Sequence, residues 1–137
     1  MPVSPDVLGQ VPLFSQLKRK ELERLTRHFL ERRFAPGDEI MSEGNIGTGM
    51  YIVESGTAQV VRAGKVIATV GPAGFFGEIA LIDGGTRTAT VIAQTELLCH
   101  GLTAWDFRGI VEKDARISWA LTQELARRLR ANHLDDL

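Results

Sequence analysis

The sequence contains one cysteine, Cys99, and three histidines, His28, His100 and His133, scattered along 137 residues. A single cysteine forms no internal disulfide and no cysteine-based zinc site, so we expect Cys99 to be a buried residue of a strand. The histidines lack metal-ligand spacing, and nothing in the sequence supports a metal site. No Ser-His-Asp or Cys-His arrangement and no catalytic carboxylate pair can be argued from spacing, so we expect no enzymatic activity.

Excess charge and long apolar runs are also missing. Sixteen Lys and Arg residues stand against seventeen Asp and Glu residues, so no global positive field attracts the chain to nucleic acid. No apolar stretch approaches the roughly 18 residues of a membrane span, and the first residues do not resemble a signal peptide. We expect a soluble, cytoplasmic protein without a transmembrane segment. The basic cluster from Lys18 to Arg33 favours a solvated helix face over an acidic partner or a membrane surface.

Glycine is abundant but unevenly placed. Eleven of the fourteen glycines lie between Gly37 and Gly85, whereas both flanks are rich in leucine and charged residues. This contrast predicts a β-rich middle with helical ends. After Ser15, apolar residues recur at helical spacing with charge between them, which predicts an amphipathic helix that ends near Leu30.

The C-terminal flank predicts two helices. LTAWDFRGIVEKD, residues 102–114, can form a short helix, and ARISWALTQELARRLRANHL, residues 115–134, can form a longer one. Apolar residues of the second segment lie four apart on one broad stripe: Ile117, Leu121, Leu125 and Leu129.

Short runs rich in Val, Ile, Thr and Tyr fill the middle of the chain. GMYIVE, TAQVVR and KVIATV are separated by Ser55-Gly56 and Ala63-Gly64, which predicts two successive hairpins. RTATVIA and TELLCHGL predict a further pair, and RRFAPGDEIMSEG supplies two earlier strands.

The predicted fold class is α+β, mainly β. It is an antiparallel β-roll or jelly roll of seven to eight short strands, with an N-terminal helix, a short internal helix and two C-terminal helices. We expect a single domain over residues 1–137, divided into an N-terminal helical segment (10–33), a β-roll (34–103) and C-terminal helices (104–137).

The stretch FFGEIALIDGGTRTATV, residues 75–91, interrupts the β pattern. The residues after Gly77 can form one helical turn, whose first N–H groups lack intrahelical partners and favour an anion such as phosphate. Arg87 follows a sharp turn and offers a fork of donors that suits two phosphate oxygens. Glu78 would repel phosphate but can accept a hydrogen bond from a sugar hydroxyl. The two side chains together suggest a small nucleotide.

The segment FGEIAL, a five-residue loop and then RTATV resemble the phosphate-binding cassette of cyclic nucleotide-binding domains. These β-roll modules occur in the catabolite-activator family, in cyclic-nucleotide-dependent kinases and in cyclic-nucleotide-gated channels. The resemblance covers almost the whole chain, because VPLFSQLKRKELERL is similar to the family's first helix and FAPGDEIMSEGNIGTGMYIVESGTAQV to its early strands. It implies a sensor or regulatory module that binds cAMP or cGMP.

The resemblance also implies a role for each cassette residue. Glu78 would accept a hydrogen bond from the ribose 2′-hydroxyl, and Arg87 would pair with the cyclic phosphate. A hydroxyl residue after the arginine can contact guanine in relatives, so Thr88 permits cGMP, while analogy with bacterial modules favours cAMP. The predicted ligand-binding set, which includes no metal, is Gly77, Glu78, Ile79, Ala80, Arg87, Thr88 and Ala89.

Other interpretations stay open at this level. Glu78 and Arg87 could form a structural salt bridge in a protein-interaction module with a degenerate pocket, or the roll could bind another small anion. Catabolite-activator regulators carry a DNA-reading domain after the last helix, whereas this chain stops at Leu137, so we expect no nucleic-acid binding by this chain alone. The C-terminal helices, with Trp119, Leu121 and Leu125, would transmit the signal as a lid, a homodimer seam or the site of a protein partner.

Overall fold

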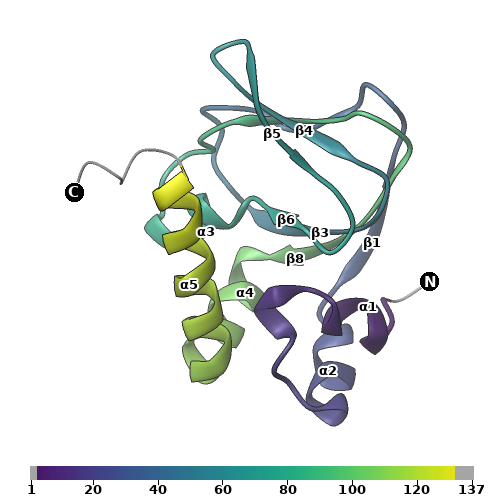
Figure 1. The fold of residues 1–137 in the computed structure, drawn as a ribbon, viewed down its shortest axis with the longest axis vertical. Coiled ribbons are helices and arrows are strands. Elements are labelled where there is room, and N and C mark those ends of the chain that lie inside the picture. Colours follow the sequence, from purple (N-terminus) through teal and green to yellow (C-terminus); the bar gives the residue numbers. More distant parts are fainter. Residues whose placement is uncertain (1–2, 132–137) are drawn as a thin grey trace.

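The computed structural model describes residues 3–131, apart from the side chain of Ile79. Helices precede and follow the β-roll along the chain, as predicted (Figure 1). The helical elements are α1 (Pro5–Gly9), the 3₁₀ turn η1 (Pro12–Phe14), α2 (Arg19–Thr26), α3 (Glu78–Asp83), α4 (Ala104–Lys113) and α5 (Ala115–Ala131). The strands are β1 (Leu30–Phe34), β2 (Glu39–Met41), β3 (Gly49–Ser55), β4 (Ala58–Arg62), β5 (Lys65–Val70), β6 (Phe75–Phe76), β7 (Thr90–Ala93) and β8 (Leu97–Thr103).

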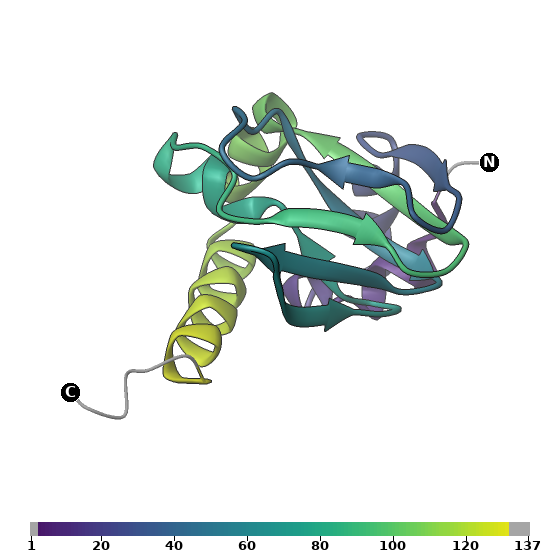
Figure 2. The same cartoon turned by 90° about the horizontal axis from the view of Figure 1, so that it is seen from above.

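Two four-stranded antiparallel sheets form the roll. The first has the order β1-β8-β3-β6 and the second β2-β7-β4-β5. The first sheet lies between the second sheet and the helices α1, α2 and α4, while α5 extends to one side of the roll (Figures 1 and 2). The prediction of a mainly β, antiparallel roll with flanking helices and one internal helix is therefore confirmed.

One predicted hairpin is present and two predicted strand pairings are wrong. β4 and β5 pair through Ala63 and Gly64, which both have positive φ, as a tight turn between twisted strands requires. β3 and β4 instead lie in different sheets, and so do β7 and β8. At Gly56 the chain crosses from one sheet to the other against the β7–β8 connection, where a Cβ would lie 2.0 Å from the carbonyl oxygen of Glu96. The sheet that each of these strands joins is therefore determined by closure of the roll and not by the local turn.

β3 separates two apolar clusters because its side chains alternate between the faces of the sheet. Met50 and Ile52 pack with residues of α1, α2, α4 and α5 in what we call the helix-side cluster. Val53 and Tyr51 face the interior of the roll and belong to the interior cluster. Cys99 is fully buried in the interior cluster, where burial raises the pKa of its thiol to about 12. It is the buried strand residue that the sequence predicts.

The helical ends differ in detail from the sequence prediction. α2 ends at Thr26, and Leu30 already begins β1, so the N-terminal helix is shorter than its apolar spacing suggests. α5 buries Ile117 and Leu121 in the helix-side cluster. The predicted helical residues 132–134 lie outside the described part of the chain, as does His133, and the division into 10–33, 34–103 and 104–137 stays a prediction. No helix within residues 3–131 has the length and apolar character that crossing a bilayer requires.

Candidate functional site

The cassette, defined here as residues 75–91, begins with a sharp turn from β6 into α3. Gly77 forms the N-cap of α3 with φ +94°, in the left-handed region that favours glycine. A Cβ at Gly77 would lie 2.9 Å from Met41 Cε and 3.0 Å from Arg87 Nη1. The turn thus needs glycine both for its backbone conformation and for the close approach of the Arg87 guanidinium.

Arg87 points back across this turn, as predicted. Its Nη1 donates to the carbonyl oxygen of Gly77 at 2.7 Å, and its Nη2 donates to the carbonyl oxygen of Gly49 at 2.6 Å. The residue is only 6% exposed, and within residues 3–131 no carboxylate lies at ion-pair distance from it. Burial lowers the pKa of Arg87 from its ordinary value, although the guanidinium stays charged at neutral pH. Two β-roll carbonyls therefore hold a buried cation that has no ion-pair partner among residues 3–131.

Glu78, the first residue of α3, is buried beside this cation and is 1% exposed. It does not pair with Arg87. Its Oε1 instead accepts a hydrogen bond from Nη1 of Arg128, which comes from the C-terminal part of α5. The simple interpretation of Glu78 and Arg87 as a salt bridge across the turn is therefore wrong.

The second carboxylate oxygen of Glu78 has no hydrogen-bond partner. Oε2 is buried, and it is one of two such side-chain atoms within residues 3–131, the other being Nδ1 of His100. Burial raises the pKa of Glu78, and the nearby Arg128 opposes that rise. A buried acceptor without a donor is costly, and one explanation for it at such a position is a ligand that supplies the donor.

A hollow of about 840 Å³ lies over the cassette, in the size range of small-molecule pockets. Its walls come from β4, β5, the cassette and α5. The predicted residues Gly77, Glu78, Ala80, Arg87, Thr88 and Ala89 all line it. The side chain of Ile79 lies outside the described residues. Thr88 is exposed at the rim, and its carbonyl oxygen accepts a hydrogen bond from Arg62 Nε at 3.1 Å.

Sequence analysis missed Arg128 as a member of this site. The residue lies seven positions after Leu121 and three after Leu125, and so on the same face of α5. Leu125 and Leu129 line the hollow beside it. The sequence signal that could have identified Arg128 is therefore an arginine on the apolar stripe of the last helix. Trp119, in contrast, is 63% exposed and faces away from the core.

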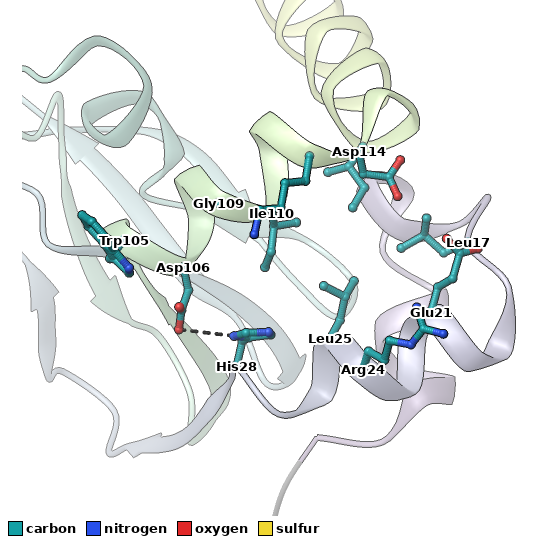
Figure 3. A pocket seen from close by; sticks show the side chains of 12 residues that line it. Leu17, Glu21, Arg24, Leu25, His28, Trp105, Asp106, Gly109, Ile110 and Asp114 are labelled. Carbon is teal, nitrogen blue, oxygen red and sulfur yellow. Dashed lines mark ion pairs between the residues drawn. The ribbon is translucent and has the colours of Figure 1, made fainter.

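A second hollow of about 360 Å³ lies between α2 and α4, away from the cassette (Figure 3). Apolar residues of both helices form its floor, and charged residues surround it. His28 Nδ1 lies 3.6 Å from Asp106 Oδ2 at its rim, and Glu21 is paired with Arg116. Neither of the two unpartnered buried atoms lies in this hollow. The part of the chain that the structure describes also contains no group of three potential metal ligands.

Comparisons with known proteins identify the family of this domain. The family model described as the cyclic nucleotide-binding domain matches residues 31–114. The chain is 35% identical over 115 residues to the cAMP-dependent protein kinase type II regulatory subunit of Drosophila melanogaster, covering 84% of this chain and 30% of that protein. It is 32% identical over 131 residues to the cyclic AMP receptor protein of Thermus thermophilus, covering 90% and 60%.

The fold likeness extends to solved structures. The crystal structure of the Thermus thermophilus catabolite activator protein superposes with a TM-score of 0.83 at 30% identity, over 90% of this chain and 61% of that one. The chain spans 60% or less of the length of each of the two curated relatives named above. Since the family model covers more than half of the chain, this protein belongs to the cyclic nucleotide-binding domain family.

Proposed function

We propose that this chain is a regulatory module that binds a 3′,5′-cyclic nucleotide in the hollow over the cassette. The observation that carries the proposal is the buried Arg87 guanidinium, which two carbonyl oxygens hold without a carboxylate partner among the described residues, at the wall of a hollow large enough for a nucleotide. A buried cation without a carboxylate partner is stabilised by an anionic ligand. Family membership makes the cyclic phosphate the anion of choice.

In this proposal the phosphate lies between Arg87 and the first turn of α3. Arg87 would donate charge-assisted hydrogen bonds to the phosphate oxygens, each of which contributes about 1.5–3 kcal/mol. The free N–H groups of the turn from Gly77 to Ala80, which includes Ile79, would donate to the same oxygens. Ala80 is nearly buried and has a small side chain, which keeps this approach open. Thr88 and Ala89 would complete the phosphate contacts.

The sugar and the base occupy the remaining space. Glu78 would accept a hydrogen bond from the ribose 2′-hydroxyl, which supplies the donor that its buried Oε2 lacks. Apolar side chains of β4, β5 and α5 would pack against the purine: Val60, Val70, Leu125 and Leu129. Because Thr88 lies at the rim of the hollow, it leaves room for cGMP as well as cAMP, and we favour cAMP because the two relatives above are named for it.

The regulatory role follows from the kind of relatives and from the position of α5. Both relatives named above are regulatory or receptor proteins, and catalysis plays no part in this proposal. α5 contributes part of the hollow wall, so a ligand that packs there changes the contacts of the C-terminal helices. We propose that these helices pass the signal to a protein partner or to a second copy of the chain, that the chain itself contacts no nucleic acid, and that it acts in the cytoplasm.

Calorimetric titration with cAMP, cGMP and AMP tests the proposal. Wild-type protein should bind a cyclic nucleotide, and the ligand should raise the melting temperature with the logarithm of its concentration. Arg87→Leu should lower the affinity by at least about a hundredfold, because two charge-assisted hydrogen bonds are lost. Arg127→Leu, which removes an exposed arginine of α5 outside the hollow, is the control and should bind like wild type. Wild-type affinity in the Arg87→Leu protein would overturn the proposal.

A further inference from the structure

The Arg128–Glu78 pair connects α5 to the cassette at the position proposed for the sugar. Arg128 donates to Glu78 through Nη1 and to the carbonyl oxygen of Phe75 through Nη2 at 3.2 Å. Its guanidinium also lies over the Phe75 ring, 4.5 Å from the centroid, and its Nε is 3.3 Å from Glu124 Oε1. These contacts fix the planar group on three sides, and so they fix the carboxylate that it holds.

The pair leaves the nucleotide site open. The hollow of about 840 Å³ exists with Arg128 bound to Glu78, and Arg128 is itself part of the hollow wall. An ionised carboxylate has about four lone-pair positions, and Arg128 uses only one oxygen of Glu78. The unpartnered Oε2 retains its capacity to accept. One carboxylate can therefore serve the arginine and a hydroxyl donor together.

Apolar packing holds the N-terminal half of α5 more firmly than its last turns. Ile117 and Leu121 are 2% and 4% exposed in the helix-side cluster, Leu125 is partly buried against the same cluster, and Leu129 is 56% exposed. Arg128 lies about two turns beyond Leu121. The position of the last turns of α5 thus depends in part on the group that Arg128 binds in the cassette.

We propose, on the basis of the function proposed above, that Arg128 is a positioning residue of the nucleotide site. It holds Glu78 through one oxygen and orients the carboxylate for the 2′-hydroxyl of the ligand, so that the sugar and α5 stabilise each other through a shared acceptor. The sugar would seat α5 more firmly, and Arg128 would in turn raise the affinity for a ribonucleotide over its 2′-deoxy analogue.

Affinities for cAMP and 2′-deoxy-cAMP, measured by calorimetry, test this coupling. Wild type should prefer cAMP by about ten- to a hundredfold, the range for one hydrogen bond to a charged group. Arg128→Met should lower cAMP affinity about tenfold and leave 2′-deoxy-cAMP affinity nearly unchanged, so that the preference shrinks. Arg128→Lys, which keeps the charge and loses the planar fork, should retain part of the preference.

Arg127→Met is the matched control. Arg127 is the neighbouring arginine of α5, is largely exposed and pairs with Glu124 at 3.0 Å outside the hollow. Its replacement should change neither affinity. A pH series adds a measurement that a purely structural role would not affect. Without Arg128, burial is opposed less and the Glu78 pKa rises further, so the preference in Arg128→Met should fall as the pH is lowered from 8 to 6 more than in wild type.

The possible results separate this proposal from the function on which it rests. If wild type binds no cyclic nucleotide, the proposed function itself fails. If wild type binds cAMP but Arg128→Met keeps the full preference for the 2′-hydroxyl, Arg128 does not position Glu78. If Arg128→Met binds cAMP more tightly than wild type, Arg128 competes with the sugar, and the proposal is wrong. Should Arg128→Met fail to fold, the preference measured in Arg128→Lys decides.

Discussion

The two hollows of this protein hold their charged groups in different ways. Between α2 and α4, His28 and Asp106 form a pair at 3.6 Å with side chains that are 45% and 33% exposed, and Arg116 pairs with both Glu21 and Asp114 near the surface. Over the cassette, Glu78 and Arg87 are 1% and 6% exposed. The carboxylates of the first hollow are partly solvated and paired with neighbouring side chains. Among the residues that the structure describes, the cassette instead has a cation held by carbonyl oxygens and an acceptor without a donor.

This difference indicates where a ligand contributes binding energy. Exposed pairs contribute little to stability, because water already satisfies each partner. A buried polar group without a partner costs free energy in the empty state, and a ligand that supplies the partner recovers that cost on binding. The α2–α4 hollow has an apolar floor and a mixed rim, and nothing in it selects one class of ligand. Under the proposed function, the cassette would select an anion joined to a hydroxyl donor.

Gly77→Ala should show the largest effect on the cassette. The substitution places an L-residue at φ +94° and a Cβ within 3.1 Å of Met41, Arg87 and Gly49. We expect the free energy of unfolding to fall by about 2 kcal/mol, partly from the backbone and partly from overpacking, and cyclic nucleotide affinity to fall because Arg87 must shift. Denaturant unfolding and calorimetry measure the two changes.

Gly84→Ala is the matched control at the other end of α3. Gly84 also has a positive φ of +71°, but a Cβ there meets nothing within 4 Å. Its replacement should cost about 1 kcal/mol through the backbone alone and leave nucleotide affinity unchanged. If both variants lost the same nucleotide affinity, the effect of Gly77→Ala would not come from a clash with Arg87.

The two hollows should respond to pH with opposite signs. Burial raises the pKa of Glu78 above its unfolded value, so the stability that this residue contributes is present below about pH 4.3 and is lost as the pH rises through the folded pKa. Hydrogen bonds from Arg116 lower the pKa of Glu21, so its contribution is present above about pH 4.3 and is lost as the pH falls.

Urea unfolding of Glu78→Gln and Glu21→Gln against wild type, between pH 3.5 and 7, checks these signs. Relative to wild type, Glu78→Gln should gain stability as the pH rises, and Glu21→Gln should lose it. Parallel profiles for the two variants would mean that burial does not raise the pKa of Glu78, and the contrast between the two hollows would no longer hold.

The sequence was sufficient to predict the fold class, the family, and a turn at Gly77 with Arg87 pointing back across it. The glycine-rich middle predicts a β-roll, and Gly77, Glu78 and Arg87 lie within one continuous stretch whose turn chemistry is local. The family expected from that stretch is confirmed by the family model and by the relatives, which favour a cyclic nucleotide sensor over an interaction module with a degenerate pocket.

What the sequence could not supply depends on contacts between distant segments. Turn residues at Ser55-Gly56 predict a reversal, but they do not say whether the next strand joins the same sheet or the opposite one. Arg128 lies 50 residues after its partner Glu78, and the packing of α5 through Ile117, Leu121 and Leu125 brings the two together. In place of the Glu78–Arg87 bridge that the sequence left open as an alternative, this packing gives a Glu78–Arg128 pair that joins the cassette to the C-terminal helix.

Arg116→Gln should have the smallest effect. Arg116 bonds Glu21 and Asp114 at the surface, where salt screens such pairs over about 8–10 Å. We expect a slightly lower melting temperature at low ionic strength, no difference from wild type in 0.5 M NaCl, and unchanged cyclic nucleotide affinity. Because α2 and α5 both contribute to this cluster, a change in nucleotide affinity would show that the α2–α4 hollow is coupled to the cassette through α5. The α2–α4 hollow and the hollow over the cassette would then belong to one connected network of interactions and could no longer be contrasted as independent sites.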